Sequence, residues 1–211
     1  MVLKELDPFL GGPEDLDARI SADRMAYYLR RFYRRSAEVD VLHGLSVRSG
    51  GSMACIDHLL LHAHGLLVIQ REDVAGRVRI DDDGQWLKCD DPAAVPMGSP
   101  ITRAYVQALL LKAFLDRRVR QKGLFDKLEL DVLVVVADGC QIEWPPTGRL
   151  AEVCSRDLVF QRVTARLAQC GGSATGPGPL TANERRILGE FLRQSHCQEP
   201  RLVPDPGAQG L

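Results

Sequence analysis

Two apolar segments joined by a short turn constrain the fold of this chain more than any other feature. They cover residues 53–63 and Gly65–Glu72, and they meet at His64-Gly65. Apolar runs of this length beside a glycine turn predict a β-hairpin. A third run, residues 132–137, is rich in valine and continuously apolar, which is typical of a strand covered on both faces. We therefore expect a buried sheet at the centre of the fold.

Helical spacing of apolar residues predicts two long helices around this sheet. Apolar residues from Met25 to Phe32 recur at i, i+3, i+4 and i+7, with Ser21 as the expected N-cap. A second helix starts at Ser99-Pro100, where serine caps and proline occupies the first turn. Further strands are expected at residues 39–45 and 76–80, a polar loop at 89–98, and helices at 157–168 and 184–194, the last with a Thr181/Glu184 capping box. The fold class is α/β, a mixed sheet flanked by helices.

Side chains with oxygen atoms gather at one end of the predicted hairpin. Gln70 and Glu72 alternate with Arg71, so they share one strand face while Arg71 points the other way. Asp57, on the preceding strand, can approach that face, and three such oxygens suit a hard divalent cation such as Mg²⁺. The alternative is that Asp57 only accepts hydrogen bonds from a neighbouring loop, because a buried acid needs partners.

Histidines offer a second metal hypothesis, which the turn disfavours. His58, His62 and His64 share the parity of one strand face, but the turn near His64 would separate their rings. His43 is interpreted as a packed, hydrogen-bonded residue. We expect Trp86, beside the Gly84 turn, to anchor the core.

Charge is balanced overall but uneven along the chain. The 211 residues include 27 Lys and Arg against 28 Asp and Glu, which argues against a uniformly basic surface but allows a local basic face. Bases gather at the ends of the two long helices, where they are either solvated or form a rim that contacts phosphates. The candidate nucleic-acid-binding residues are Arg30, Arg31, Arg34, Arg35, Arg117, Arg118, Arg120 and Lys122.

Several protein classes are disfavoured. No apolar run approaches the roughly 20 residues of a membrane helix, and the first residues lack the apolar core of a secretory signal. The six cysteines are scattered without zinc-like spacing, which favours free thiols in a reducing compartment. Phosphate loops, dinucleotide fingerprints and serine elbows are also missing from the sequence. We expect a cytoplasmic protein with no membrane partner.

An ordered set of short segments resembles the nuclease-related domain (NERD) family. The set consists of Val41-Leu42-His43-Gly44, Ile56-Asp57-His58, Gly65–Glu72, Gly76-Arg77-Val78, Gly84-Gln85-Trp86, Ser99-Pro100 and residues 132–136. That family resembles a branch of the PD-(D/E)xK, restriction-endonuclease-like superfamily. The resemblance covers roughly residues 20–140. It implies a mixed four- to five-stranded sheet flanked by helices, with a metal-dependent phosphodiesterase centre.

The residues at the implied centre depart from the family pattern. Asp57 matches the family aspartate, whereas Gln70 stands where the family has Glu and Glu72 where it has Lys. In the family pattern the acids hold the metal and the lysine supplies positive charge. Arg103 stands where the family shows Gln after Pro100, and we hypothesise that it restores that charge. Mg²⁺ or Mn²⁺ is the implied cofactor if the centre is active, and none otherwise.

Two functions follow from the resemblance. In the first, the protein acts on or binds nucleic acid, DNA being favoured over RNA, with hydrolysis weakened or abolished by the Asp57…Gln70-x-Glu72 arrangement. In the second, the fold is a non-catalytic binding or assembly module for a protein partner that the sequence does not identify. Superfamily analogy also allows a homodimer. The expected organisation is an irregular N-terminal arm at 1–19, the nuclease-like domain at 20–140, packed C-terminal helices at 141–197 and a flexible tail at 198–211.

Overall fold

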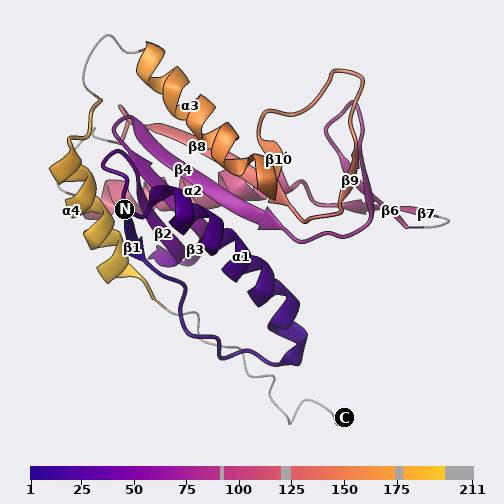
Figure 1. Ribbon diagram of the computed structural model, residues 1–211, viewed down its shortest axis with the longest axis horizontal. Helices are drawn as coiled ribbons and strands as arrows, with labels where there is room; N and C mark the ends of the chain where they lie inside the picture. Colours follow the sequence, from indigo (N-terminus) through magenta and orange to yellow (C-terminus); the bar gives the residue numbers. More distant parts are fainter. Residues whose placement is uncertain (91–92, 120–124, 174–177, 198–211) are drawn as a thin grey trace.

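A six-stranded mixed sheet forms the centre of the protein (Figure 1). The computed structural model describes residues 1–90, 93–119, 125–173 and 178–197. The strand order is β1 (Val2–Lys4), β2 (Asp40–Ser49), β3 (Ser52–His62), β4 (Gly65–Glu72), β8 (Glu129–Val136) and β10 (Val153–Ser155). The strands β2, β3 and β4 are antiparallel neighbours, whereas β1 joins β2 and β8 joins β4 and β10 in parallel. The predicted mixed α/β class and the β3–β4 hairpin are confirmed.

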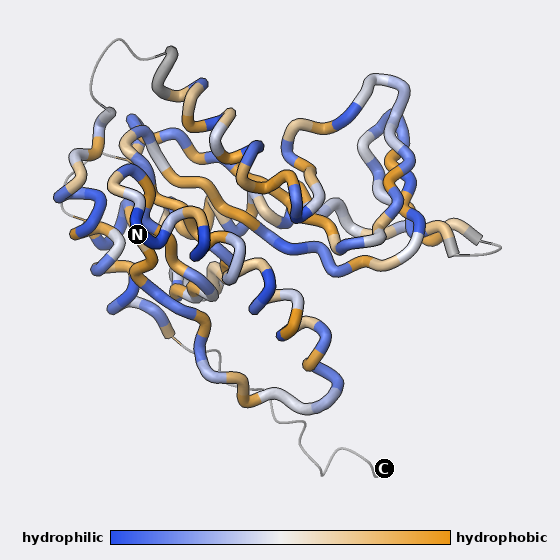
Figure 2. The backbone as a smooth tube through the Cα atoms, viewed as in Figure 1, coloured by the Kyte–Doolittle hydropathy of each residue, from blue (hydrophilic) through white to orange (hydrophobic). Residues whose placement is uncertain are grey.

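Helices cover both faces of this sheet. The helices α1 (Leu16–Tyr33) and α3 (Val159–Ser173) pack on one face, and α2 (Pro100–Arg118) and α4 (Ala182–Ser195) pack on the other (Figure 1). Figure 2 shows the hydrophobic residues concentrated along the central strands. The fold therefore has two apolar cores, one on each side of the sheet.

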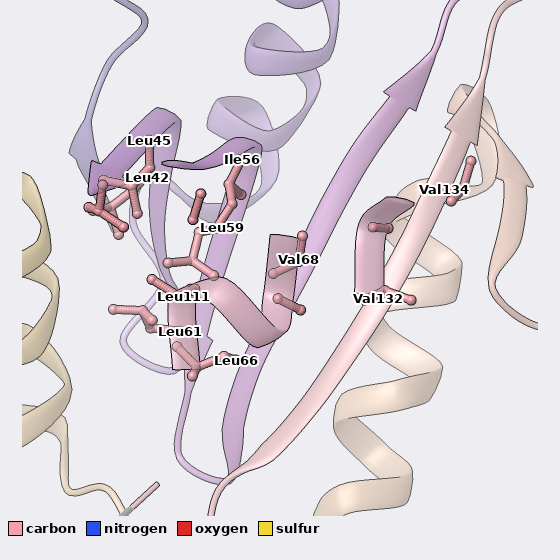
Figure 3. Close-up of a cluster of buried hydrophobic side chains, with 14 of the residues drawn as sticks. Leu42, Leu45, Ile56, Leu59, Leu61, Leu66, Val68, Leu111, Val132 and Val134 are labelled. Atoms are coloured by element: carbon pink, nitrogen blue, oxygen red, sulfur yellow. The ribbon is translucent and has the colours of Figure 1, made fainter. Parts of the chain in front are cut away.

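Alternation along β4 divides its side chains between these cores. Leu66 and Val68 join the core under α2 and α4, which Figure 3 shows, whereas Leu67 and Ile69 join the core under α1 and α3. All four are almost completely buried, as expected for a central strand between helical layers. The same alternation places Gln70 and Glu72 on the α2 side.

A second, four-stranded sheet projects from the main body (Figure 1). Its order is β7 (Ala93–Met97), β6 (Trp86–Asp90), β5 (Arg77–Ile80) and β9 (Gln141–Glu143). Trp86 is fully buried and anchors it to the core, as the sequence predicted. The predicted polar loop at 89–98 is wrong, because this segment completes β6 and supplies β7. Pro96 hides the strand signal, since proline cannot donate to a ladder, yet it is tolerated on this edge strand.

The N-terminal segment is more ordered than the sequence predicted. The expected irregular arm at 1–19 contains β1, which extends the sheet beside β2, and β1 is too short for a periodic signal. The 3₁₀ turn η1 (Pro13–Asp15) leads directly into α1. Ser21 is therefore not an N-cap but lies inside the helix, where its hydroxyl donates to Asp73.

Caps define the other helix starts as predicted. The Ser99 hydroxyl accepts the backbone N–H of Thr102, and Thr181 and Glu184 form a reciprocal capping box. Residues 141–197 are not purely helical, because they also contain β9, β10 and η2 (Arg156–Leu158). The glycine- and proline-rich stretch at 171–179 predicts an irregular connector. This prediction is partly wrong, since α3 extends to Ser173, and residues 174–177 lie outside the described residues. The predicted tail, 198–211, also lies outside them.

Two observations bear on the protein's surroundings. All six cysteines are free thiols. Within the described ranges, none of the helices combines the length and apolar character needed to cross a membrane.

Candidate functional site

The candidate site lies where β3 and β4 stop pairing. Their ladder runs from His62 opposite Gly65 to His58 opposite Ile69. Beyond it the side chain of Gln70 takes over, because Oε1 accepts the backbone N–H of Asp57 at 2.8 Å and Nε2 donates to the Cys55 carbonyl at 3.1 Å. The Gln70 amide thus supplies hydrogen-bond partners for two backbone groups of β3 that no longer pair with the backbone of β4.

An irregularity in β2 and β3 accompanies this change. Leu42 and Leu45 pack into the same core, although residues three positions apart in a regular strand face opposite sides. Gly44 lies between them with φ of +58°, a backbone conformation that favours glycine. Ile56 and Leu59 on β3 show the same switch of face. Asp57 therefore occupies a distorted position in its strand.

Asp57 is held by Arg71, the residue between Gln70 and Glu72. One carboxylate oxygen of Asp57 accepts the Arg71 backbone N–H at 2.8 Å, and the other lies 3.4 Å from Nη2 of the Arg71 guanidinium. Nη1 of Arg71 donates to the Ala18 carbonyl of α1 and pairs with Asp73 at 3.1 Å. Arg71 thus faces α1, on the side of the sheet opposite to Gln70 and Glu72, as alternation predicts.

Glu72 is held by Arg103 from the first turn of α2. The two side chains form an ion pair in which Nη2 of Arg103 donates to Oε2 of Glu72. Partial burial raises the pKa of Glu72, the Arg103 charge opposes this rise, and Asp73 and Asp57 add to it. Arg103 is 56% exposed, so its guanidinium also faces solvent. The positive charge hypothesised from the sequence thus lies beside Glu72.

The oxygen donors at this site do not fit a resident Mg²⁺ ion. The Gln70 oxygen accepts a hydrogen bond from the Asp57 backbone, and the Asp57 carboxylate accepts one from Arg71. The Glu72 carboxylate forms an ion pair with Arg103. A divalent cation needs several carboxylate, carbonyl or water oxygens directed at one point. No group of three or more His, Cys, Asp and Glu side chains in the described ranges is arranged to hold a metal.

Sequence reasoning missed the roles of two residues at this site. Strand alternation predicts only the orientation of Arg71, although an arginine followed directly by Glu72 and Asp73 signals an ion pair. Gln107 accepts the Cys55 backbone N–H at 2.7 Å from α2, so Gln70 and Gln107 together satisfy both backbone groups of Cys55. Gln107 lies four residues after Arg103, so the two share one side of the helix. This spacing was the sequence signal that could have placed Gln107 at the site.

The histidines near the site are neutral core residues. His43 and His58 are completely buried, and their Nδ1 atoms lie 2.9 Å apart in a hydrogen bond. Burial lowers the pKa of His43 to about 4 and that of His58 well below its usual value. His62 is also buried, with its pKa lowered by burial to about 4. His43 is therefore packed and hydrogen-bonded, as predicted.

The basic residues singled out from the sequence lie in two separate places. Helix α1 ends near Val39 at the start of β2, whereas α2 ends beside the β2–β3 hairpin on the opposite face of the sheet. Arg30 pairs with Glu5 through two hydrogen bonds of 3.0 and 2.6 Å, and Arg31, Arg34 and Arg35 are exposed. Arg117 and Arg118 are exposed, and Arg120 and Lys122 lie outside the described residues. The described members of the two groups therefore lie on opposite faces of the sheet.

Comparison with known families agrees with the residues that suggested a resemblance. A sequence model of the nuclease-related domain matches residues 19–138, from within α1 to just beyond β8 and more than half of the chain. No curated protein and no solved structure matches the chain. The matched segment contains Asp57, Gln70, Glu72 and Arg103. The chain belongs to the nuclease-related domain family.

Proposed function

We propose that this protein binds nucleic acid through its nuclease-related domain without hydrolysing the phosphodiester bond. The observation that carries the proposal is the pairing of both acids of the site with arginines, Asp57 with Arg71 and Glu72 with Arg103. Each pairing uses carboxylate oxygens that a catalytic metal would need. The family membership supports a nucleic-acid partner, and DNA is the form we expect.

The chemistry of hydrolysis explains why this arrangement argues against cleavage. Metal-assisted phosphodiester hydrolysis needs a cation held by free oxygens and positive charge directed at the pentavalent phosphate. Gln70 contributes a neutral oxygen that is already bonded to the Asp57 backbone. Arg103 would have to supply the positive charge for the pentavalent phosphate, but its ion pair with Glu72 neutralises much of that charge.

The same residues still favour contact with a phosphate. The Arg103 guanidinium has five N–H donors, of which Glu72 engages only part, and more than half of the side chain is exposed. A backbone phosphate can bind the remaining donors without any metal. The site then positions nucleic acid and leaves it intact.

A labelled oligonucleotide tests both halves of this proposal. Fluorescence anisotropy with single- and double-stranded DNA and with RNA, in Mg²⁺ or Mn²⁺, should show binding, and a denaturing gel should recover the strand uncut. Absence of binding to all three would favour the alternative, a module for a protein partner. Cleavage that depends on Asp57 would instead support an active nuclease.

A further inference from the structure

A basic groove lies between the β2–β3 hairpin and the end of α2. One hollow of about 280 Å³ is lined by Arg48, Ser49, Gly50, Phe114, Arg117 and Arg118. A second hollow of about 310 Å³ shares Arg48, Phe114 and Arg118 with it and continues toward Phe191 of α4. Because the two share these residues, they form one depression, which we call the hairpin groove.

Three arginines converge on the hairpin groove without acidic partners. Arg48 comes from β2, and Arg117 and Arg118 come from the last turn of α2; all three are exposed. In the described part of the chain they form no ion pair, unlike the arginines of the candidate site. Favourable interaction with the helix dipole accounts for bases at the end of α2, but not for Arg48 on a neighbouring strand. Their convergence creates a local positive potential that attracts an anion.

Ser49 provides an independent indication of a ligand. It lines the groove, is only 5% exposed, and its hydroxyl has no hydrogen-bond partner among the described residues. Burying a hydroxyl without a partner is unfavourable, so such a group in a native fold calls for an explanation. An anion oxygen in the groove would accept the Ser49 hydroxyl hydrogen.

The hairpin turn allows Arg117 to lie close to Gly50, the residue after Ser49. Gly50 has φ of +65°, and a Cβ atom placed on it would approach Nη1 of Arg117 to 2.9 Å. The guanidinium therefore packs against the turn instead of extending freely into solvent. Phe114 and Phe191 stack beneath the groove with ring centroids 5.9 Å apart, which gives it a fixed base.

We propose that the hairpin groove binds a phosphate group of the nucleic-acid backbone, as a second contact beyond the candidate site. Guanidinium groups pair with phosphate oxygens in a bidentate manner, and Ser49 adds a hydroxyl donor. This inference rests on the proposed function for the source of the phosphate. The groove chemistry itself would also suit a free phosphorylated molecule.

The geometry of α2 sets the length of nucleic acid that reaches both places. Arg103 and Arg117 are fourteen residues apart, about 21 Å along a helix that rises 1.5 Å per residue, and nearly four turns place them on one side. At about 3.4 Å per nucleotide, this distance corresponds to roughly six nucleotides. Oligonucleotides shorter than this should engage only one of the two places.

Alanine variants tested with two probes separate the groove from the proposed function. Calorimetry with inorganic phosphate and anisotropy with a labelled twelve-nucleotide DNA strand should be run on wild type, Arg48→Ala, Arg117→Ala and Ser49→Ala. Arg79→Ala, which removes an exposed arginine from the second sheet, is the matched control. Thermal unfolding checks that each variant is folded, and Ser49→Ala should not lower stability, since the hydroxyl it removes has no partner within the described chain.

The expected result is specific to the groove. Arg48→Ala and Arg117→Ala should each weaken strand binding about tenfold, and the slope of log affinity against log salt should become shallower by about 0.7 for each phosphate that is no longer bound. The control should bind like wild type, and a four-nucleotide strand should show a smaller loss than the twelve-nucleotide strand. Equal strand binding by wild type and both arginine variants would overturn the groove and leave the proposed function standing. If wild type binds inorganic phosphate, the arginine variants lose that binding, and wild type does not bind the DNA strand, then the phosphate does not come from nucleic acid. That result would overturn the proposed function as well.

Discussion

The side-chain oxygen of Gln70 accepts the backbone N–H of Asp57, 2.8 Å away. The resemblance to the family pattern implies a metal-binding glutamate at this position. Here the amide completes the backbone hydrogen bonding of β3, because its nitrogen also donates to the Cys55 carbonyl. The Gln70 side chain therefore takes part in the hydrogen bonding of the sheet.

Gln70→Glu should destabilise the protein, because a carboxylate cannot donate to the Cys55 carbonyl. Leaving that carbonyl without its partner and placing an anion beside it should cost about 1–3 kcal/mol of unfolding free energy, measured by urea denaturation. Gln107→Glu is the matched control, since Gln107 only accepts from Cys55 and a carboxylate can still do so. Equal losses in the two variants would contradict this role for Gln70.

The double variant Gln70→Glu/Glu72→Lys introduces the residues that the family resemblance implies, and would create cleavage if these two side chains alone prevented it. We expect no cleavage in a plasmid-nicking assay, because Arg71 still engages Asp57 and the new glutamate weakens the sheet. If the double variant nicks plasmid and adding Asp57→Ala abolishes the nicking, then Gln70 and Glu72 alone prevent this protein from acting as a nuclease.

Arg103→Ala should make stability more sensitive to pH. Burial already raises the pKa of Glu72, and loss of the nearby positive charge should raise it further. A raised carboxyl pKa favours the folded state below the unfolded value of 4.5, and this advantage disappears as pH rises through the folded pKa. The variant should therefore be less stable than wild type at pH 7, by less than about 1 kcal/mol because the pair is partly exposed, with a smaller deficit at pH 4. A stability deficit that does not change with pH would contradict the role of Glu72 in this effect. Adding Glu72→Gln to Arg103→Ala should remove the pH dependence of the deficit.

The buried His43–His58 pair should make the protein acid-sensitive. The unfolded chain takes up protons near the ordinary histidine pKa of 6.5, whereas folded His43 resists until about pH 4 and His58 until lower. Stability should thus fall as pH drops from 6.5 toward 4, by about 1.4 kcal/mol per unit for each histidine. Urea denaturation of His43→Leu/His58→Leu should show a shallower fall than wild type, with buried His62 still contributing. An unchanged slope would exclude the pair as the cause.

Gly44→Ala should cost about 1–2 kcal/mol, because a residue with a Cβ atom is strained at φ of +58°. The added methyl would also lie 3.3 Å from Leu6. Gly51→Ala in the β2–β3 turn is the comparison, since a Cβ there meets nothing within 4 Å. If the two variants have similar thermal stability, the irregularity at Gly44 does not depend on glycine.

Much of the fold could be predicted because its long elements carry strong patterns. The β3–β4 hairpin follows from two apolar runs around a turn, and α2 and α4 follow from their caps. The three-residue strands β1 and β10 could not be predicted, since they are too short for a period and exist through pairing with distant β2 and β8. Tertiary pairing, not local propensity, defines these edges of the sheet.

The candidate site was predictable only in part, for a related reason. Alternation correctly placed Gln70 and Glu72 together and Arg71 on the other face. Alternation could not show that β2 is irregular at Gly44 beside Asp57 of β3, or that Arg71 pairs with Asp57. Those contacts depend on a positive φ angle and on the approach of α1, neither of which has a local sequence period.

The most direct test of the central claim is a plasmid-nicking assay on wild type and Asp57→Ala, with Mg²⁺ and with Mn²⁺, at protein concentrations where anisotropy shows DNA binding. Arginine pairing at both acids predicts bound plasmid with the same background nicking for the two proteins. Nicking by wild type that Asp57→Ala abolishes, with DNA binding retained, would contradict the account.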